Sequence, residues 1–119
     1  MVLISSLMGT DYEIDTDGKI LFLEELKEPP HKLGRILWQL KLSGKFDNVT
    51  GVIIGDIYEC DDGDDSALKG ILEFFDRNVD VPVIYNVHAG HYVNPITIPL
   101  GAEACIHGDC ISIEQCVVE

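Results

Sequence analysis

The fold is decided by residues 20–40, ILFLEELKEPPHKLGRILWQL. Ile20 to Leu23 are uniformly apolar, which is typical of a strand buried on both faces of a parallel sheet. Two prolines at 29–30 end this strand and can begin a helix, because the first helical turn tolerates proline. Apolar residues then recur at 33, 36, 37 and 40, and this spacing predicts a helix with one buried face that ends at Gly44.

The alternation of strand and helix continues through the middle of the chain. Val52 to Gly55 predicts a second buried strand, and a helix capped by Asp65 or Ser66 is expected to run to Arg77. Val81 to Val87 predicts a third strand. This order implies an α/β fold with a parallel core sheet.

The remaining segments flank this core. The first eight residues predict the tail of a helix that ends at Gly9, so the chain is expected to begin inside a helical element. The acidic segment 56–65 is interpreted as a solvated connection, because its residues do not fit the spacing of an EF-hand calcium loop. Residues 97–119 alternate short apolar runs with glycines and predict antiparallel strands, which would add a second sheet.

Length and composition limit the function classes. The 119 residues suit one domain with a real core, and 46% of them are hydrophobic. A formal net charge of -13 argues against nucleic acids and anionic membranes as partners, because both are polyanions. No apolar run approaches the roughly 20 residues that span a bilayer, and the N-terminus lacks the features of a signal peptide. We therefore expect a soluble, cytoplasmic protein.

The four cysteines are expected to be free and partly buried thiols. They are Cys60, Cys105, Cys110 and Cys116, and their spacing matches no established metal pattern. A cytosolic protein also rarely contains disulfides.

Glu24 and His91 are the candidate catalytic residues. Glu24 follows the first predicted strand and His91 follows the third. Functional groups of parallel α/β sheets gather at the carboxyl ends of the strands, so these two side chains could meet. A carboxylate that fixes the imidazole tautomer leaves the second ring nitrogen free to take a proton from a nucleophile. The alternative is that Glu24 is an ordinary solvated or ion-paired residue.

No cofactor or metal is predicted. A zinc site can be imagined from His88 and His91 with Cys105 or His107, but His88 and His91 lie in a glycine-containing segment and do not share a helical face. None of the five serines lies in a Gly-x-Ser-x-Gly elbow, so a complete nucleophilic site cannot be assembled from this chain.

Several blocks of the sequence resemble, in order, the C-terminal domain of LD-carboxypeptidases, a family that includes the microcin-immunity peptidases. The resemblance extends from about Leu7 to Ile113. Its blocks are Leu7-Met8-Gly9-Thr10, Ile20 to Glu25, Glu28-Pro29-Pro30, Arg35 to Leu40, Gly51 to Gly55, Val81 to Ile84, Gly90-His91 and Pro99 to Ala102. The departures are mild: Asp11 replaces a common proline, His31 an aromatic residue and Lys32 an arginine.

The resemblance implies a fold, a reaction and a partner. The fold would be a three-layer β/β/α swivelling-type domain that covers residues 1–119. The reaction would be removal of the terminal D-alanine from murein tetrapeptides by a Ser-Glu-His triad. Glu24 would orient His91, with Glu25 as the second choice for the carboxylate, on the opposite side of the strand. The serine would belong to an N-terminal domain that this chain does not contain.

Two further expectations follow from the missing half. The chain is expected to be inactive alone, either as a part of a split enzyme or as a non-enzymatic remnant that binds a peptide or a partner chain. The surface that would face the N-terminal domain is expected to be exposed and apolar, which favours a homodimer.

Overall fold

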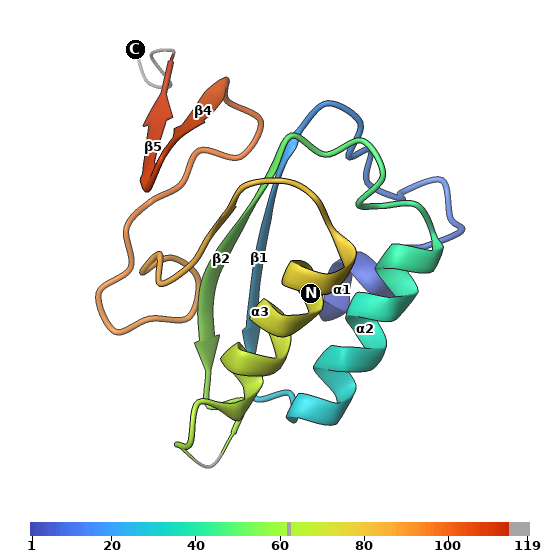
Figure 1. Cartoon of the computed structure of the whole chain (residues 1–119), viewed down its shortest axis with the longest axis vertical. Coiled ribbons are helices and arrows are strands. Elements are labelled where there is room, and N and C mark those ends of the chain that lie inside the picture. The colour runs from blue at the N-terminus through green and yellow to red at the C-terminus, as the bar shows by residue number, and fades with distance from the viewer. Residues whose placement is uncertain (62, 115–119) are drawn as a thin grey trace.

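A computed structural model describes residues 1–61 and 63–114 of the chain, and it contains three helices and five strands within those ranges (Figure 1). The elements, in chain order, are α1 (Val2–Ser6), β1 (Ile20–Leu26), α2 (Pro30–Leu42), β2 (Gly51–Tyr58), α3 (Ser66–Asn78), β3 (Val83–Ile84), β4 (Ala104–His107) and β5 (Cys110–Ile113).

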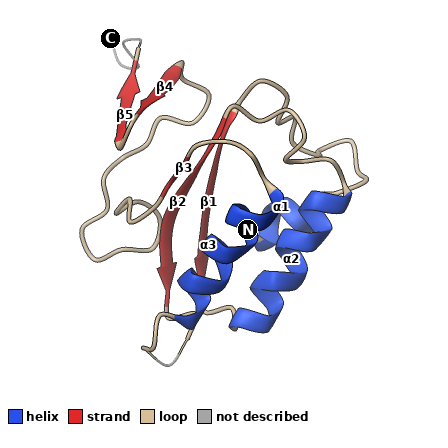
Figure 2. Ribbon diagram, viewed as in Figure 1, coloured by secondary structure: helices blue, strands red, loops and turns tan. Residues whose placement is uncertain are grey.

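Two sheets and one helical layer make up the architecture. Strands β1, β2 and β3 form a parallel sheet in the order β1-β2-β3, and β4 and β5 form an antiparallel hairpin. Figure 2 shows the helices together on one side of the parallel sheet, with the hairpin displaced from it on the other side. The prediction of an α/β fold with a parallel core and a separate antiparallel sheet is therefore confirmed.

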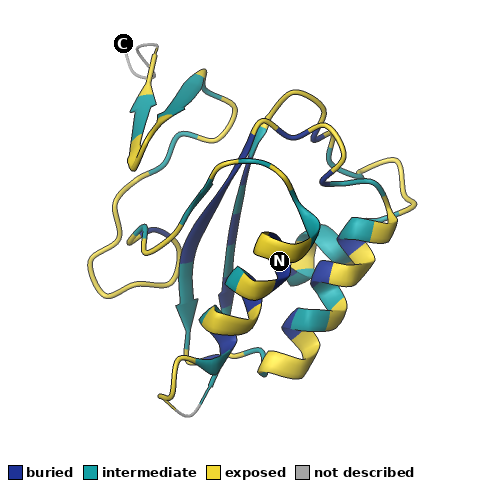
Figure 3. Ribbon diagram, viewed as in Figure 1, coloured by how far each residue is buried: buried dark blue, intermediate teal, exposed yellow. Residues whose placement is uncertain are grey.

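The core lies between the parallel sheet and the helices (Figure 3). Burial alternates along β1, and Leu21 and Leu23 are buried with Leu37 and Leu40 of α2. The alternate side chains of β1, including Phe22, point to the face that the helices do not cover. Glu24 shares that second face with Phe22, because the two residues are two positions apart in the strand.

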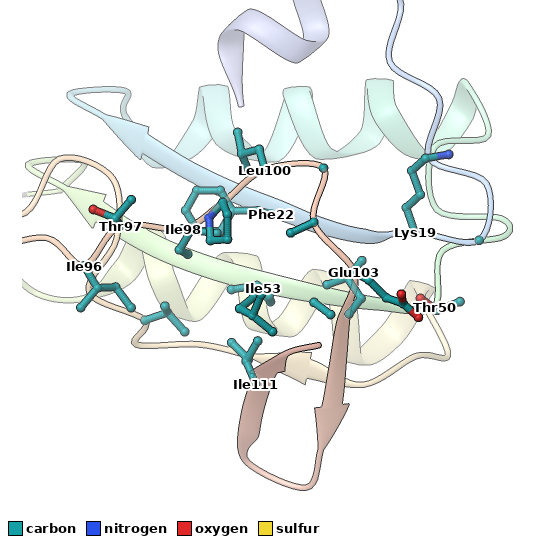
Figure 4. Close-up of a pocket in the computed structure, with 18 residues that line it drawn as sticks. Lys19, Phe22, Thr50, Ile53, Ile96, Thr97, Ile98, Leu100, Glu103 and Ile111 are labelled. Atoms are coloured by element: carbon teal, nitrogen blue, oxygen red, sulfur yellow. The ribbon is translucent and has the colours of Figure 1, made fainter. Parts of the chain in front are cut away.

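The hairpin contacts the parallel sheet through one face. Ile106 lies so close to Gly51 of β2 that a Cβ atom at Gly51 would be 2.6 Å from the Ile106 Cδ1 atom. Between this hairpin, the sheet and the segment that crosses them is an apolar groove of about 430 Å³. Phe22 and Ile53 from the sheet line the groove together with Ile98 and Ile111 (Figure 4).

The third strand and the C-terminal strands are shorter than predicted. The expected strand over 81–87 is reduced to Val83–Ile84. Pro82 has no N–H, and Asn86 has a φ of 59°, which turns the chain out of the sheet. The expected antiparallel strands form only over 104–113, and residues 115–119 lie outside the described residues.

The acidic segment differs from its predicted form at both ends. Its first residues, 56–58, complete β2 instead of forming a loop. The expected cap of α3 is also wrong, because neither Asp65 nor Ser66 caps the helix with its side chain. Asp65 has a φ of 57°, and the carboxylate of Asp61 accepts the N–H of Ala67 at 3.2 Å instead.

No helix in the described part of the chain is both long enough and apolar enough to cross a membrane.

Candidate active site

Glu24 and His91 meet at the carboxyl end of the parallel sheet. The Oε2 atom of Glu24 lies 2.6 Å from Nδ1 of His91, although the two residues are 67 positions apart in sequence. An ionised carboxylate only accepts hydrogen bonds, so this contact places a proton on Nδ1 and leaves Nε2 unprotonated in the neutral ring. The imidazole is half exposed, at 51%, and Nε2 is therefore available to a group that approaches from outside.

Backbone contacts with β2 position the segment that carries His91. The N–H of Asp56 donates to the carbonyl of Ala89 at 3.0 Å, and the N–H of Val87 donates to the carbonyl of Ile54 at 3.4 Å. Ala89 is buried, and its carbonyl oxygen would be 2.5 Å from a Cβ atom at Gly55. A glycine at 55 thus allows the segment to lie directly on the strand.

A second glycine allows the close approach of the two candidate catalytic residues. Gly90 has a φ of 109°, which L side chains rarely adopt. A Cβ atom at this position would lie 2.8 Å from Oε2 of Glu24. Gly90 therefore gives His91 its direction and also leaves space for the carboxylate.

Comparisons with known proteins show the family to which the chain belongs. Residues 1–106 match the family described as the LD-carboxypeptidase C-terminal domain. The chain belongs to this family. It is similar to a probable murein peptide carboxypeptidase of Bacillus subtilis, at 33% identity over 88% of this chain and 34% of that protein. The structure is similar to that of a muramoyltetrapeptide carboxypeptidase from Oxalobacter formigenes, with a TM-score of 0.73 and 25% identity over 92% of this chain and 40% of that one.

The microcin C7 self-immunity protein of Escherichia coli is a further relative of this LD-carboxypeptidase domain, at 27% identity over 78% of the chain and 27% of that protein. The chain thus spans about a third of the length of the curated relatives that it matches.

The neighbouring carboxylate, Glu25, has a structural position in this LD-carboxypeptidase domain. It points to the opposite side of β1 from Glu24, as strand alternation predicts, and it is buried. Its Oε2 atom accepts the N–H of Val2 at 2.7 Å and lies 3.0 Å from the α-ammonium group of Met1. Its Oε1 atom accepts the N–H of Leu26 at 3.1 Å. Glu25 therefore joins α1 to the sheet.

Burial alone would raise the pKa of Glu25, but the hydrogen bonds from Val2 and Leu26, together with the α-ammonium group, outweigh burial and lower it. A lowered pKa means that ionised Glu25 stabilises the fold. This stabilisation is fully present above the ordinary glutamate pKa of about 4.3. It is lost as the pH falls through the lowered folded-state value.

We expect Glu25→Gln to reduce the free energy of unfolding at pH 7 by about 1.5–3 kcal/mol, the range for hydrogen bonds to a charged group. The difference from the wild-type chain should shrink as the pH falls below about 4. Urea unfolding at several pH values measures both effects. The matched control is Glu73→Gln, an exposed glutamate on α3. An equal loss in both variants, or a difference that does not depend on pH, would contradict the role of Glu25.

A second histidine–carboxylate pair lies beside the first and was not found from the sequence. Nδ1 of His88 is 3.7 Å from Oδ1 of Asp56, and the His88 ring stacks on Tyr92 with centroids 4.2 Å apart. The Asp56 side chain is only 9% exposed, and its Oδ2 atom has no hydrogen-bond partner among the described residues. The sequence predicts that Asp56 lies in a solvated loop, and nothing in its pattern indicates that the side chain is buried.

The structure does not bring together the zinc ligands considered from the sequence, His88 and His91 with Cys105 or His107. His88 and His91 lie with carboxylates at the carboxyl end of the sheet, whereas Cys105 and His107 lie on the hairpin. Among the described cysteines, Cys60 is buried and free, and burial raises the pKa of its thiol.

Proposed function

We propose that this chain is the C-terminal half of a serine-type LD-carboxypeptidase, which removes the terminal D-alanine from murein tetrapeptides. The contact between Glu24 and Nδ1 of His91 carries this proposal. It is supported by the family and by the names of the relatives, which are murein peptide and muramoyltetrapeptide carboxypeptidases.

The nucleophile would come from a second domain. None of the five serines of this chain forms a hydrogen bond with His91, and the relatives are about three times as long. We propose an N-terminal domain as the partner, with a serine hydroxyl presented to Nε2 of His91. The half-exposed ring is accessible for such an approach.

In the proposed chemistry, His91 transfers the proton and Glu24 orients and stabilises the His91 ring. Glu24 holds Nδ1–H and stabilises the imidazolium ion that forms when Nε2 takes the proton of the serine. The serine oxygen then attacks the carbonyl carbon of the bond to D-alanine. His91 returns the proton to the leaving amine, and water later hydrolyses the acyl-enzyme by the same steps.

The test is D-alanine release from murein tetrapeptide by this chain alone, by a separately produced N-terminal domain alone, and by the two mixed. Activity only in the mixture supports the proposal. No activity in the mixture, with both parts folded by circular dichroism and associated by sedimentation, would contradict it.

The structure also suggests a change that displaces Glu24 without removing it. We expect Gly90→Ala to lower the activity of the mixture about 100-fold, because a displacement of about 1 Å in a catalytic group has effects of that size. Gly9→Ala is the matched control, since Gly9 also has a positive φ, of 78°, but no atom within 4 Å of the added Cβ. Equal losses in the two variants would assign the effect to backbone strain alone.

The second candidate is a non-enzymatic domain that binds a peptide, and the apolar groove of about 430 Å³ favours it. Binding of murein tetrapeptide to the isolated chain, weakened by Phe22→Ala and unaffected by His91→Ala, would support this candidate.

We also propose a homodimer. Exposed apolar residues, among them Val93, Ile96 and Leu100, support it. A sedimentation profile with only monomer at high protein concentration would contradict that homodimer.

A further inference from the structure

The β4–β5 hairpin has two different faces. In its pairing register, Ala104 lies opposite Ile113 and Ile106 lies opposite Ile111. This apolar face is directed to the body of the domain, since Ile106 contacts Gly51 and Ile111 lines the groove. The side chains that alternate with these residues must point the other way.

That second face combines thiol, imidazole and hydroxyl groups. Cys105 pairs with Ser112, and His107 pairs with Cys110. The hydrogen bond from the N–H of Glu114 to the carbonyl of Glu103, at 2.9 Å, extends the register by one pair. Glu114 is therefore on the same face as Ser112, two positions away.

Three potential metal ligands converge on this face. The ligand atoms of Cys105, His107 and Glu114 all lie within 4.8 Å of one another. The hydroxyl of Ser112 donates a hydrogen bond to Oε1 of Glu114 and so fixes the carboxylate on the hairpin surface. This is the one such group of three among residues 1–61 and 63–114.

We propose that Cys105, His107 and Glu114 bind one borderline-soft divalent transition-metal ion, with zinc as its representative. A thiolate, an imidazole and a carboxylate suit zinc, whereas magnesium and calcium prefer oxygen ligands alone. In a tetrahedral site the ligand atoms lie roughly 3.5 Å apart, so modest side-chain rotations would close this cluster around the ion. Solvent would occupy the fourth position.

The site is separate from the proposed catalytic pair. Gly51, which the hairpin contacts, is the first residue of β2, whereas Glu24 lies near the carboxyl end of β1 and contacts His91 there. Neither His88 nor His91 belongs to the cluster. The ion would therefore hold the two strands of the hairpin together and would take no part in peptide hydrolysis.

Zinc alone, titrated into the reduced chain, tests the proposal. We expect one zinc ion per chain by elemental analysis, and a thiolate-to-metal absorption band when cobalt replaces zinc. Zinc should shift the amide NMR signals of residues 104–114 and leave those of residues 88–92 in place. Shifts confined to 88–92, or no zinc retained after dialysis, would overturn the proposal.

Single substitutions test the ligand set. Cys105→Ser, His107→Gln and Glu114→Gln should each weaken binding at least about 10- to 100-fold, since even residues that only orient a ligand have effects of this size. The matched controls are Cys110→Ser, an exposed thiol on the same hairpin whose Sγ atom contacts Asp109, and His31→Gln on α2. Both should retain wild-type affinity. Loss of binding in Cys110→Ser, or unchanged binding in Glu114→Gln, would overturn the assignment, and circular dichroism confirms that each variant is folded.

Discussion

If His91 is the general base proposed above, its replacement with alanine is expected to lower the rate of D-alanine release by the two-domain mixture on the order of 10⁶-fold, as removal of the general base does in a serine protease. Without the imidazole, no group is left to take the proton of the serine. The affinity for the tetrapeptide should change little, because the lost interaction belongs to the transition state.

Glu24→Gln is expected to lower the rate of D-alanine release on the order of 10⁴-fold, although it keeps the size and shape of the side chain. A glutamine amide can donate its N–H to Nδ1 of His91, and this favours the tautomer with the proton on Nε2. In that tautomer the ring cannot accept the proton of the serine. The double variant should be no slower than His91→Ala alone, because the two residues act as one unit.

Two exposed residues provide matched controls for these variants. His31→Ala and Glu73→Gln change the same residue types at positions on α2 and α3, and both should leave the activity of the mixture unchanged. Activity within about 10-fold of wild type in His91→Ala would contradict the proposed mechanism, because a missing general base costs far more than that.

Phe75→Ala is expected to have the largest effect on stability. It should lower the free energy of unfolding by about 3–5 kcal/mol, the range for replacing a buried aromatic residue with alanine. Phe75 is 1% exposed, and its ring packs edge-on against two others. The ring centroids are 5.3 Å apart for Phe46 and 5.5 Å apart for Phe74. It therefore connects α3 to the segment after α2. The midpoint and slope of urea unfolding measure the loss of free energy.

Since small domains are stable by only about 5–15 kcal/mol, Phe75→Ala could leave the chain largely unfolded. Phe75→Leu should lower the free energy of unfolding less than Phe75→Ala does, so that the variant stays folded and the loss can be measured. Leu42→Ala is the control, because Leu42 lies at the end of α2 and is 83% exposed. A loss below about 1 kcal/mol in Phe75→Ala would show that the core can close around the cavity.

The sequence predicted the parts of the fold in which a strong periodic pattern coincides with a clear stop signal. The strand from Ile20, the helix from Pro30 and the second strand with its following helix are of this kind. The strands nevertheless run further than their apolar runs, to Leu26 and Tyr58. Glu24, Glu25 and Asp56 lie within strands because the pairing of β1 with β2 resumes at Glu25 and Ile57 after a register shift, and composition does not reveal this.

Tertiary contacts explain the predictions that were wrong. The cap of α3 comes from Asp61, four residues before the N-cap position, and only the folded loop brings it there. The third strand ends early because the left-handed turn at Asn86 directs the chain onto β2.

The candidate site was predictable only in part, for a similar reason. Glu24 and His91 could be paired from their places after two parallel strands and from the family resemblance. The contact between Asp56 and His88 depends on the path of the loop across β2, and the stacking of Tyr92 on His88 depends on side-chain rotamers. Neither leaves a periodic signal in the sequence. The hairpin cluster was missed because its register, which aligns Cys105 with Ser112, depends on the turn.

The way in which the His91 segment rests on β2 has a consequence for amide hydrogen exchange. Glu24 sits on a strand of the core, whereas the backbone from Val87 to Ile96 is attached through a few isolated hydrogen bonds, including Asp56 to Ala89 and Val87 to Ile54. Segments with so few attachments open at much lower free energy than the strands beside them. The Glu24–His91 contact can therefore break and re-form many times during the lifetime of one folded molecule. A melting curve reports on the core alone, and a variant can melt like the wild-type chain after the Glu24–His91 contact is lost.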